Sequence, residues 1–218
     1  MYSNTKGLET VSQSERSEIS AYGVRALLSR NSRIRKLKRK YTPTIHGTKQ
    51  WTASWLLIDY INQCGMRKGT HVMDVGCGWG LAGIYCAKGH GATVTGVDMD
   101  PDVFPYLRLH ARLNGVDIGT MSVDFDGLND SVLKDIDVVI GSDICFWDTM
   151  VDPLKRFIRR AIGAGVRSVI IADPGRPPFE NAARYFARNK MGSVFNWAAN
   201  TPRSNQGRIL RVASGECL

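Results

Sequence analysis

The sequence predicts a doubly wound α/β fold in which most strands of the sheet are parallel. Two observations carry this prediction. Short runs rich in β-branched residues alternate with helix-length segments through the middle of the chain, and three of those segments end in a glycine, which suits a helix C-terminus. Repeated alternation of strand and helix places parallel strands in one sheet and covers both faces with helices.

An extension of residues 1–47 is expected to precede a single domain of residues 48–218. Residues 1 to about 18 are rich in Ser, Thr, Glu and Gln, a composition typical of a flexible tail. A short helix is expected over 17–28, followed by a basic connector. The segment 25–49 carries nine basic residues and no acid, which equals the formal net charge of +9. It could be a solvated surface, or it could grip nucleic-acid phosphates or an acidic protein.

The composition also limits the class of protein. Hydrophobic residues make up 43% of the 218 residues and charged residues 22%, as in soluble globular proteins. No apolar run approaches the roughly 20 residues that a membrane span needs, and the N-terminus lacks a signal-peptide core, so a cytoplasmic protein without membrane contact is expected. The five cysteines include no CxxC pair. Cys86 and His90 could share a metal, but they lack a second pair of ligands, so no metal is expected.

The helices and strands follow in order along the chain. A helix is expected over 51–63, because Trp51, Trp55, Ile58 and Ile61 recur on one side at helical spacing. The next strands are expected at 71–75, 92–97, 120–125, 137–142 and 167–173, with helices at 81–91, 101–115 and 150–165. A helix at about 180–190 and two strands at about 193–197 and 208–212 complete the fold. No helix-length segment separates these last strands, so they could form a hairpin.

Three glycines on alternate positions follow the strand at 71–75, in the stretch VMDVGCGWG. In a doubly wound sheet the ligand lies beyond the carboxyl ends of the strands, and the loop after the first strand forms its floor. Glycine permits positive φ angles and a close approach of the ligand to the main chain. Gly76, Gly78 and Gly80 are therefore expected to bind a cofactor.

Two classes of cofactor use such a loop. Counted from Gly78, GWGLAG has the GxGxxG pattern of dinucleotide binding, but a pyrophosphate would then meet the Asp74 carboxylate. Counted from Gly76, Asp74 stands two residues ahead and suits a cationic amino group. Asp98 ends the second strand, 20 residues after Gly78, where a carboxylate can accept both hydroxyls of a ribose. S-adenosylmethionine, a nucleoside with positive charge, meets this description.

Further cofactor contacts are expected at neighbouring strand ends. Asp124 can accept a hydrogen bond from an adenine amino group, and Phe125 can pack on the ring, although Phe125 could equally be core. Met99 and Ser142 are also expected to contact the cofactor, because they lie at strand ends.

DVGCGWG followed by VTGVDMD resembles the first two motifs of class I S-adenosylmethionine-dependent methyltransferases. The resemblance covers roughly residues 48–212. It implies a Rossmann-like seven-stranded sheet whose last strand is antiparallel, and a reaction that converts S-adenosyl-L-methionine to S-adenosyl-L-homocysteine.

The acceptor is expected to be selected by GSDICFWD, residues 141–148, after the fourth strand. This stretch lacks the Asn/Asp-Pro-Pro-aromatic signature of many enzymes that methylate planar amines. Asp143 and Phe146 can hold an alkyl ammonium by charge and cation–π attraction. The carboxylate can also position the amine of a lysine, whose ordinary pKa is about 10.4, once its proton has left. A capping role for Asp143 and a core position for Phe146 are the alternative.

The Asp-x-x-Phe spacing is similar to the Asp/Glu-x-x-Tyr/Phe motif of the seven-β-strand protein lysine methyltransferases. GTKQWTASWLLIDYI resembles their glycine-to-tryptophan segment, which implies that Trp51 lies beside the cofactor. IIADPGRPPF resembles the fifth-strand stretch of the enzymes that modify the electron-transfer flavoprotein β-subunit. This implies substrate contacts for Asp173 and Arg176, with a structural turn and its salt bridge as the alternative.

The sequence thus predicts a cytoplasmic N-methyltransferase that acts on a protein lysine, with Asp143 orienting the amine and Phe146 walling the site. One alternative is a methyltransferase for a small molecule or RNA. Another is a cofactor-binding protein that does not catalyse.

Overall fold

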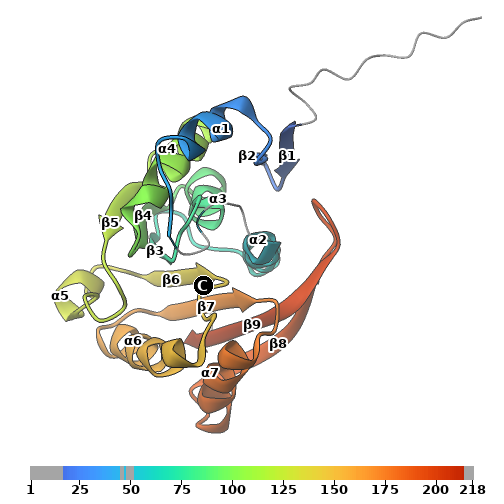
Figure 1. Ribbon diagram of the computed structural model, residues 1–218. Coiled ribbons are helices and arrows are strands. Elements are labelled where there is room, and N and C mark those ends of the chain that lie inside the picture. The colour runs from blue at the N-terminus through green and yellow to red at the C-terminus, as the bar shows by residue number, and fades with distance from the viewer. Residues whose placement is uncertain (1–16, 45–46, 48–51, 214–218) are drawn as a thin grey trace, which may run out of the picture.

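The computed structural model describes residues 17–44, 47 and 52–213, which form a seven-stranded sheet flanked by helices and a separate two-stranded hairpin (Figure 1). The strands of the large sheet are β3 (His71–Val75), β4 (Thr93–Asp98), β5 (Gly119–Ser122), β6 (Val138–Ser142), β7 (Ser168–Asp173), β8 (Gly192–Ala199) and β9 (Asn205–Ala213). Their order is β5-β4-β3-β6-β7-β9-β8, and β9 runs antiparallel to both of its neighbours. The predicted Rossmann-like doubly wound sheet, with its antiparallel last strand, is confirmed.

The main helices of the domain are α2 (Thr52–Cys64), α3 (Leu81–His90), α4 (Phe104–Asn114), α6 (Val151–Gly163) and α7 (Pro177–Arg188). The short α5 (Asp130–Leu133) and the 3-10 turns η2 (Pro101–Val103) and η3 (Asp148–Met150) were not predicted as separate elements. The last helix begins before residue 180, because Pro177 and Pro178 fit the first helical turn, where a missing N–H costs nothing.

The sheet buries an apolar core on each face. One core lies under α2, α3 and α4, and the other lies under α6 and α7 (Figure 1). Neighbouring residues of β6 divide between them, since Ile140 belongs to the first cluster and Val139 to the second. Every residue of β7 is buried, as expected for a strand covered on both sides.

The helix predicted over 17–28 is wrong, because this segment forms a hairpin. Strands β1 (Glu18–Ala21) and β2 (Val24–Leu27) pair antiparallel. Tyr22 and Gly23 join them with φ angles of 52° and 75°, the left-handed backbone of a two-residue hairpin turn. The alternation of apolar Val24, charged Arg25 and apolar Ala26 is the sequence signal that the helical interpretation missed.

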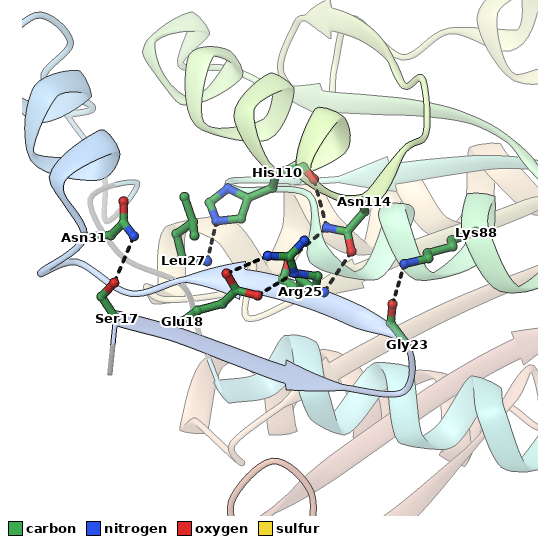
Figure 2. A network of polar contacts seen from close by, with 9 residues as sticks. All are labelled: Ser17, Glu18, Gly23, Arg25, Leu27, Asn31, Lys88, His110 and Asn114. Atoms are coloured by element: carbon green, nitrogen blue, oxygen red, sulfur yellow. Dashed lines mark hydrogen bonds and ion pairs between the residues drawn. The ribbon is translucent and has the colours of Figure 1, made fainter. Parts of the chain in front are cut away.

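Hydrogen bonds fix the hairpin to α4 (Figure 2). The backbone N–H of Leu27 donates to Nε2 of His110 over 3.1 Å. The Asn114 amide donates to the carbonyl oxygen of Arg25 and accepts from its N–H, each over 2.8 Å. Among the described residues, no further strand pairs with this edge of β2. The His110 and Asn114 side chains therefore satisfy the hydrogen-bonding groups of its backbone.

The predicted basic connector contains a helix, α1 (Ser32–Lys38), which lies beside α4 (Figure 1). Its first turn is capped by the Asn31 side chain, which accepts from the N–H of Arg33 over 2.9 Å. Ile34 is its buried residue and packs in a cluster with Tyr106 and Leu109. The basic side chains of α1 are therefore held on the surface of a packed helix. The predicted domain boundary between residues 47 and 48 stays a prediction.

Candidate functional site

The loop between β3 and α3 has left-handed backbone at all three predicted glycines, with φ angles of 63° at Gly76, 50° at Gly78 and 74° at Gly80. A Cβ atom on Gly76 would lie 2.5 Å from Cγ2 of Ile144, and one on Gly80 would lie 2.7 Å from Cγ of Leu107. A Cβ on Gly78 would meet no atom within 4 Å. The outer glycines therefore allow close packing, whereas the middle one leaves bare backbone facing open space.

Asp98 fastens this loop to the end of β4. Its Oδ2 accepts from the N–H of Gly78 over 3.1 Å, and its Oδ1 accepts from the N–H of Asp100 over 3.1 Å. Burial raises the pKa of Asp98, and the two amides oppose that shift. Each carboxylate oxygen has two lone pairs, so Asp98 can also accept hydrogen bonds from ligand hydroxyls.

A cavity of about 330 Å³ opens over this loop, at the carboxyl ends of the central strands. Its volume falls within the range of about 300–1,000 Å³ that is usual for small-molecule sites. Nine predicted site residues line it: Gly76, Gly78, Asp98, Met99, Asp124, Phe125, Ser142, Asp143 and Phe146. The structure thus brings most of the predicted cofactor and acceptor residues to one cavity.

Seven lining residues were not predicted: Gly47, Val75, Val97, Val123, Ile144, Trp147 and Met150. The two valines that end or nearly end β3 and β4 follow from the fold, because the carboxyl ends of parallel strands form this edge. Trp147 is 48% exposed and Met99 is 59% exposed, although both are large and apolar. Exposed apolar side chains beside a cavity are typical of a surface that a ligand or partner covers.

Five predicted site residues are not among those that line the cavity. Trp51 lies outside the described residues, and Gly80 serves the packing described above. Asp74 is 3% exposed, and its Oδ2 accepts from the N–H of Gly83 over 3.0 Å at the start of α3. Burial raises the pKa of Asp74 to about 7. Its contact with a cofactor amino group stays a prediction.

Asp124 and Phe125 combine structural contacts with a place in the cavity wall. Oδ1 of Asp124 accepts from the N–H groups of Asp126 and Gly127, over 3.1 and 2.9 Å, which closes the turn after β5. This turn ends β5 at Ser122, earlier than predicted. The half-buried ring of Phe125 stacks on Phe157, with ring centres 5.3 Å apart. The Phe125 ring therefore packs in the core and also borders the cavity.

The side of the cavity that is predicted to hold the acceptor, called the acceptor side below, begins at Asp143, directly after β6. Asp143 has a left-handed backbone with a φ angle of 59°, which is uncommon for a residue with a side chain and costs free energy. Its N–H donates to the carbonyl oxygen of Ala172 over 2.8 Å, which continues the pairing of β6 with β7. Beside it, Oγ of Ser142 lies 2.9 Å from Oγ of Ser54 on α2.

Arg176 lies against three groups of this acceptor side. Its Nη1 forms an ion pair and hydrogen bond with Oδ1 of Asp143 and lies 3.6 Å from Oδ2 of Asp173. Its guanidinium carbon lies 4.8 Å from the centre of the Phe146 ring. The predicted carboxylate and aromatic ring therefore do hold a cation, and that cation belongs to the protein itself.

Asp173 forms the structural turn that was weighed as an alternative. Its Oδ1 accepts from the N–H groups of Gly175 and Arg176, over 2.8 and 2.7 Å. Burial raises the pKa of Asp173 to about 6, and these amides oppose the shift. The turn and its salt bridge are present, whereas substrate contact by Asp173 or Arg176 stays a prediction.

Within the described part of the chain, no three His, Cys, Asp or Glu side chains are grouped as a metal ion would require. Cys86 is buried in the core, and Nδ1 of His90 lies 3.1 Å from the carbonyl oxygen of Met66. None of the described helices is long and apolar enough to span a membrane.

Comparisons with known proteins point to methyltransferases. Residues 72–165 match the family described as "Methyltransferase domain". Over 69 residues the chain is 42% identical to the ubiquinone biosynthesis O-methyltransferase of Coxiella burnetii, a match that covers 32% of this chain and 29% of that protein. Over 132 residues it is 24% identical to the electron transfer flavoprotein beta subunit lysine methyltransferase of Danio rerio, which covers 60% of this chain and 50% of that one.

Among solved structures, the fold is similar to the Pyrococcus abyssi tRNA (uracil-54, C5)-methyltransferase in complex with S-adenosyl-L-homocysteine. The TM-score is 0.52 at 17% identity, over 86% of this chain and 41% of that one. The chain therefore spans half or less of the length of each of these relatives.

Replacement of Asp74 by Asn tests the buried carboxylate. The pKa of Asp74 is raised in the folded protein, so the folded chain binds this proton more tightly than the unfolded chain does. The stability that Asp74 contributes is present below its unfolded pKa of about 4 and is lost as pH rises to about 7. The free energy of unfolding in urea should therefore decline more steeply over this window for the wild-type protein than for Asp74→Asn. Identical slopes would contradict the raised pKa, and exposed Asp152→Asn is the control for charge.

Proposed function

We propose that the chain is a class I S-adenosylmethionine-dependent methyltransferase and that it methylates a lysine side chain of a protein. The observation that carries this proposal is the cation held between Asp143 and Phe146 at the edge of the cavity. A carboxylate and a ring that hold a guanidinium offer the same attraction to an alkyl ammonium. The named lysine methyltransferase of Danio rerio, matched over 132 residues, supports the same acceptor.

The cofactor fits the residues of the cavity. Gly78 offers bare backbone, and Asp98 offers lone pairs to the ribose hydroxyls. Val97 and Phe125 provide apolar wall for an adenine ring. Buried carboxylates at Asp74 and Asp98 favour a ligand with positive charge.

S-adenosylmethionine supplies an activated methyl group, whose bond to sulfur breaks as the nitrogen lone pair of the acceptor attacks the methyl carbon. The protein's part is mainly alignment and the exclusion of water. Asp143 holds the nitrogen in line and favours its ammonium form until the proton leaves to solvent. Phe146 and Trp147, whose ring centres are 5.8 Å apart, wall the approach.

A small-molecule acceptor is the second candidate. The named O-methyltransferase of Coxiella burnetii has the higher identity, but over the shorter stretch of 69 residues. An RNA acceptor and a non-catalytic cofactor-binding protein also remain as alternatives, and a cytoplasmic location stays a prediction. An alkyl ammonium suits the Asp143 and Phe146 pair better than a neutral phenol does, which favours the lysine acceptor.

The partner is proposed to dock on a basic surface, defined here as Arg33, Arg35, Lys36, Lys38 and Arg39 of α1 and its C-terminus. All five side chains are exposed, and none takes part in the salt bridges found among the described residues. The following segment is tied to the cavity rim, because the N–H and hydroxyl of Thr44 donate to Asp100 over 2.5 and 2.9 Å. An acidic face of the acceptor protein would complement this charge.

Replacement of Asp98 by Ala should weaken S-adenosylmethionine binding by about 1 kcal/mol or more, through the loss of charge-assisted hydrogen bonds. Isothermal titration calorimetry of the folded variant measures the change, with exposed Asp117→Ala as the matched control. Unchanged affinity would remove the ribose role of Asp98.

The acceptor class is tested by transfer of labelled methyl from S-adenosylmethionine into a cell extract. We expect label that protease releases and nuclease does not, and peptide mapping should find it on lysine. Asp143→Asn should keep its calorimetric affinity for the cofactor and lose turnover. Nuclease-sensitive label would favour RNA, and label in neither polymer would favour a small acceptor. No label, with the cofactor bound, would favour a non-catalytic protein.

Reversal of charge at Arg35, Lys36 and Arg39 to Glu tests the basic surface. The triple variant should label protein more slowly at low salt, and the difference from the wild type should shrink as salt screens the interaction. Cofactor affinity should stay the same, because these side chains lie outside the cavity. Equal rates at low salt would show that the surface does not dock the acceptor.

A further inference from the structure

The cation site beside the cavity contains two buried carboxylates and one guanidinium. The side chain of Asp143 is 3% exposed and that of Asp173 is 0% exposed, whereas Arg176 is 27% exposed. Burial of an ionised carboxylate without a counter-ion is strongly unfavourable, so a cation between these two acids stabilises them. Arg176 is the cation that meets this need in the structure.

The site offers more acceptor capacity than Arg176 uses. Oδ2 of Asp173 is buried and accepts no hydrogen bond within the described residues, although Nη1 of Arg176 lies 3.6 Å away. An ammonium group has three N–H donors and is smaller than a guanidinium. It could reach Asp143 and Asp173 at once while its charge faces the ring of Phe146.

Arg176 is placed where it can leave this site without disturbing the fold. It is the N-cap residue of α7, and its backbone contribution to the helix is a carbonyl oxygen that accepts from the N–H of Glu180 over 2.9 Å. Its side chain makes no capping hydrogen bond. The guanidinium is partly exposed, so its stem can rotate outward while the backbone stays fixed.

We infer that Arg176 occupies the subsite for the acceptor's ammonium group, and that the acceptor lysine enters by exchange with the Arg176 guanidinium. The inference rests on the proposed lysine acceptor and adds the subsite and its gate. One cation replaces another, so the buried carboxylates are never left without a counter-ion. A neutral hydroxyl cannot make this exchange, which makes the subsite selective for cationic acceptors.

The subsite can be tested without any methyl transfer. Arg176→Gln keeps most of the side-chain stem but removes the cation, so butylammonium, a mimic of the lysine side chain, should bind in its place. The melting temperature of Arg176→Gln should rise saturably with butylammonium chloride, compared with sodium chloride at equal ionic strength and with neutral butanol. The wild type should respond only at about tenfold higher butylammonium concentration, and the control Arg184→Ala, which replaces an exposed arginine on the same helix, should behave like the wild type. The double variant Arg176→Gln with Asp143→Asn should lose the response.

If Arg176→Gln responds no more than the wild type, the subsite assignment is overturned. Should this variant fail to fold, Arg176→Lys retains a cation. Because lysine is shorter than arginine, butylammonium should compete with it more readily than with Arg176. A folded Arg176→Lys without any response would overturn the assignment equally.

Kinetics with a lysine peptide test the exchange itself. If the guanidinium fills the subsite about nine-tenths of the time, its removal should lower the KM for the peptide about tenfold, with kcat not reduced. A higher KM for Arg176→Gln would overturn the exchange and make Arg176 a direct substrate contact. Butylammonium binding by the variant, combined with no lysine methylation by any form of the protein, would leave the subsite standing and remove the proposed acceptor.

Discussion

The left-handed backbone of three glycines between β3 and α3 is the constraint on which the rest of the site depends. Gly76 lets Ile144 of the acceptor side pack against the loop, and Gly80 lets Leu107 of α4 do the same. Gly78, between them, stays open and donates its N–H to Asp98. One short loop thus sets the separation between the floor of the cavity, the Asp98 carboxylate and the residues that follow β6.

The acceptor side is governed by the cost of burying negative charge. Asp143 is held by a strained left-handed backbone and a strand hydrogen bond, and Asp173 is held by two amides of its turn. Neither carboxylate can move to water without breaking these contacts. A cation between them stabilises both carboxylates, which links the stability of this corner to the chemistry of whatever molecule binds there.

The N-terminal segment is coupled to the same loop through aromatic packing. The Trp79 ring stacks on Tyr106 and His110, with ring centres 5.4 and 5.2 Å away, and its Nε1 donates to the carbonyl oxygen of Gly47 over 2.9 Å. His110 in turn holds the hairpin, and burial lowers the pKa of His110, which favours the neutral ring that accepts from Leu27. Packed side chains therefore connect the glycine loop to the segment that carries the basic surface.

From residue 52 onward, the sequence by itself determined the order of the main strands and helices, the glycine loop and the carboxylates at the strand ends. These features are written in local periodicity and spacing, so β3 was predicted with its observed bounds and Asp98 with its place at the cavity. The hairpin over 18–27 is local and was misinterpreted as a helix, whereas its attachment to α4, more than 80 residues away, was decided only by the tertiary structure. The pairing of Arg176 with Asp143, 33 residues apart, was decided by the pairing of β6 with β7, which places the ends of these two strands side by side. Local sequence fixes which backbone forms, but only the folded chain brings distant charges together, because their interaction depends on distance in space and on the exclusion of water.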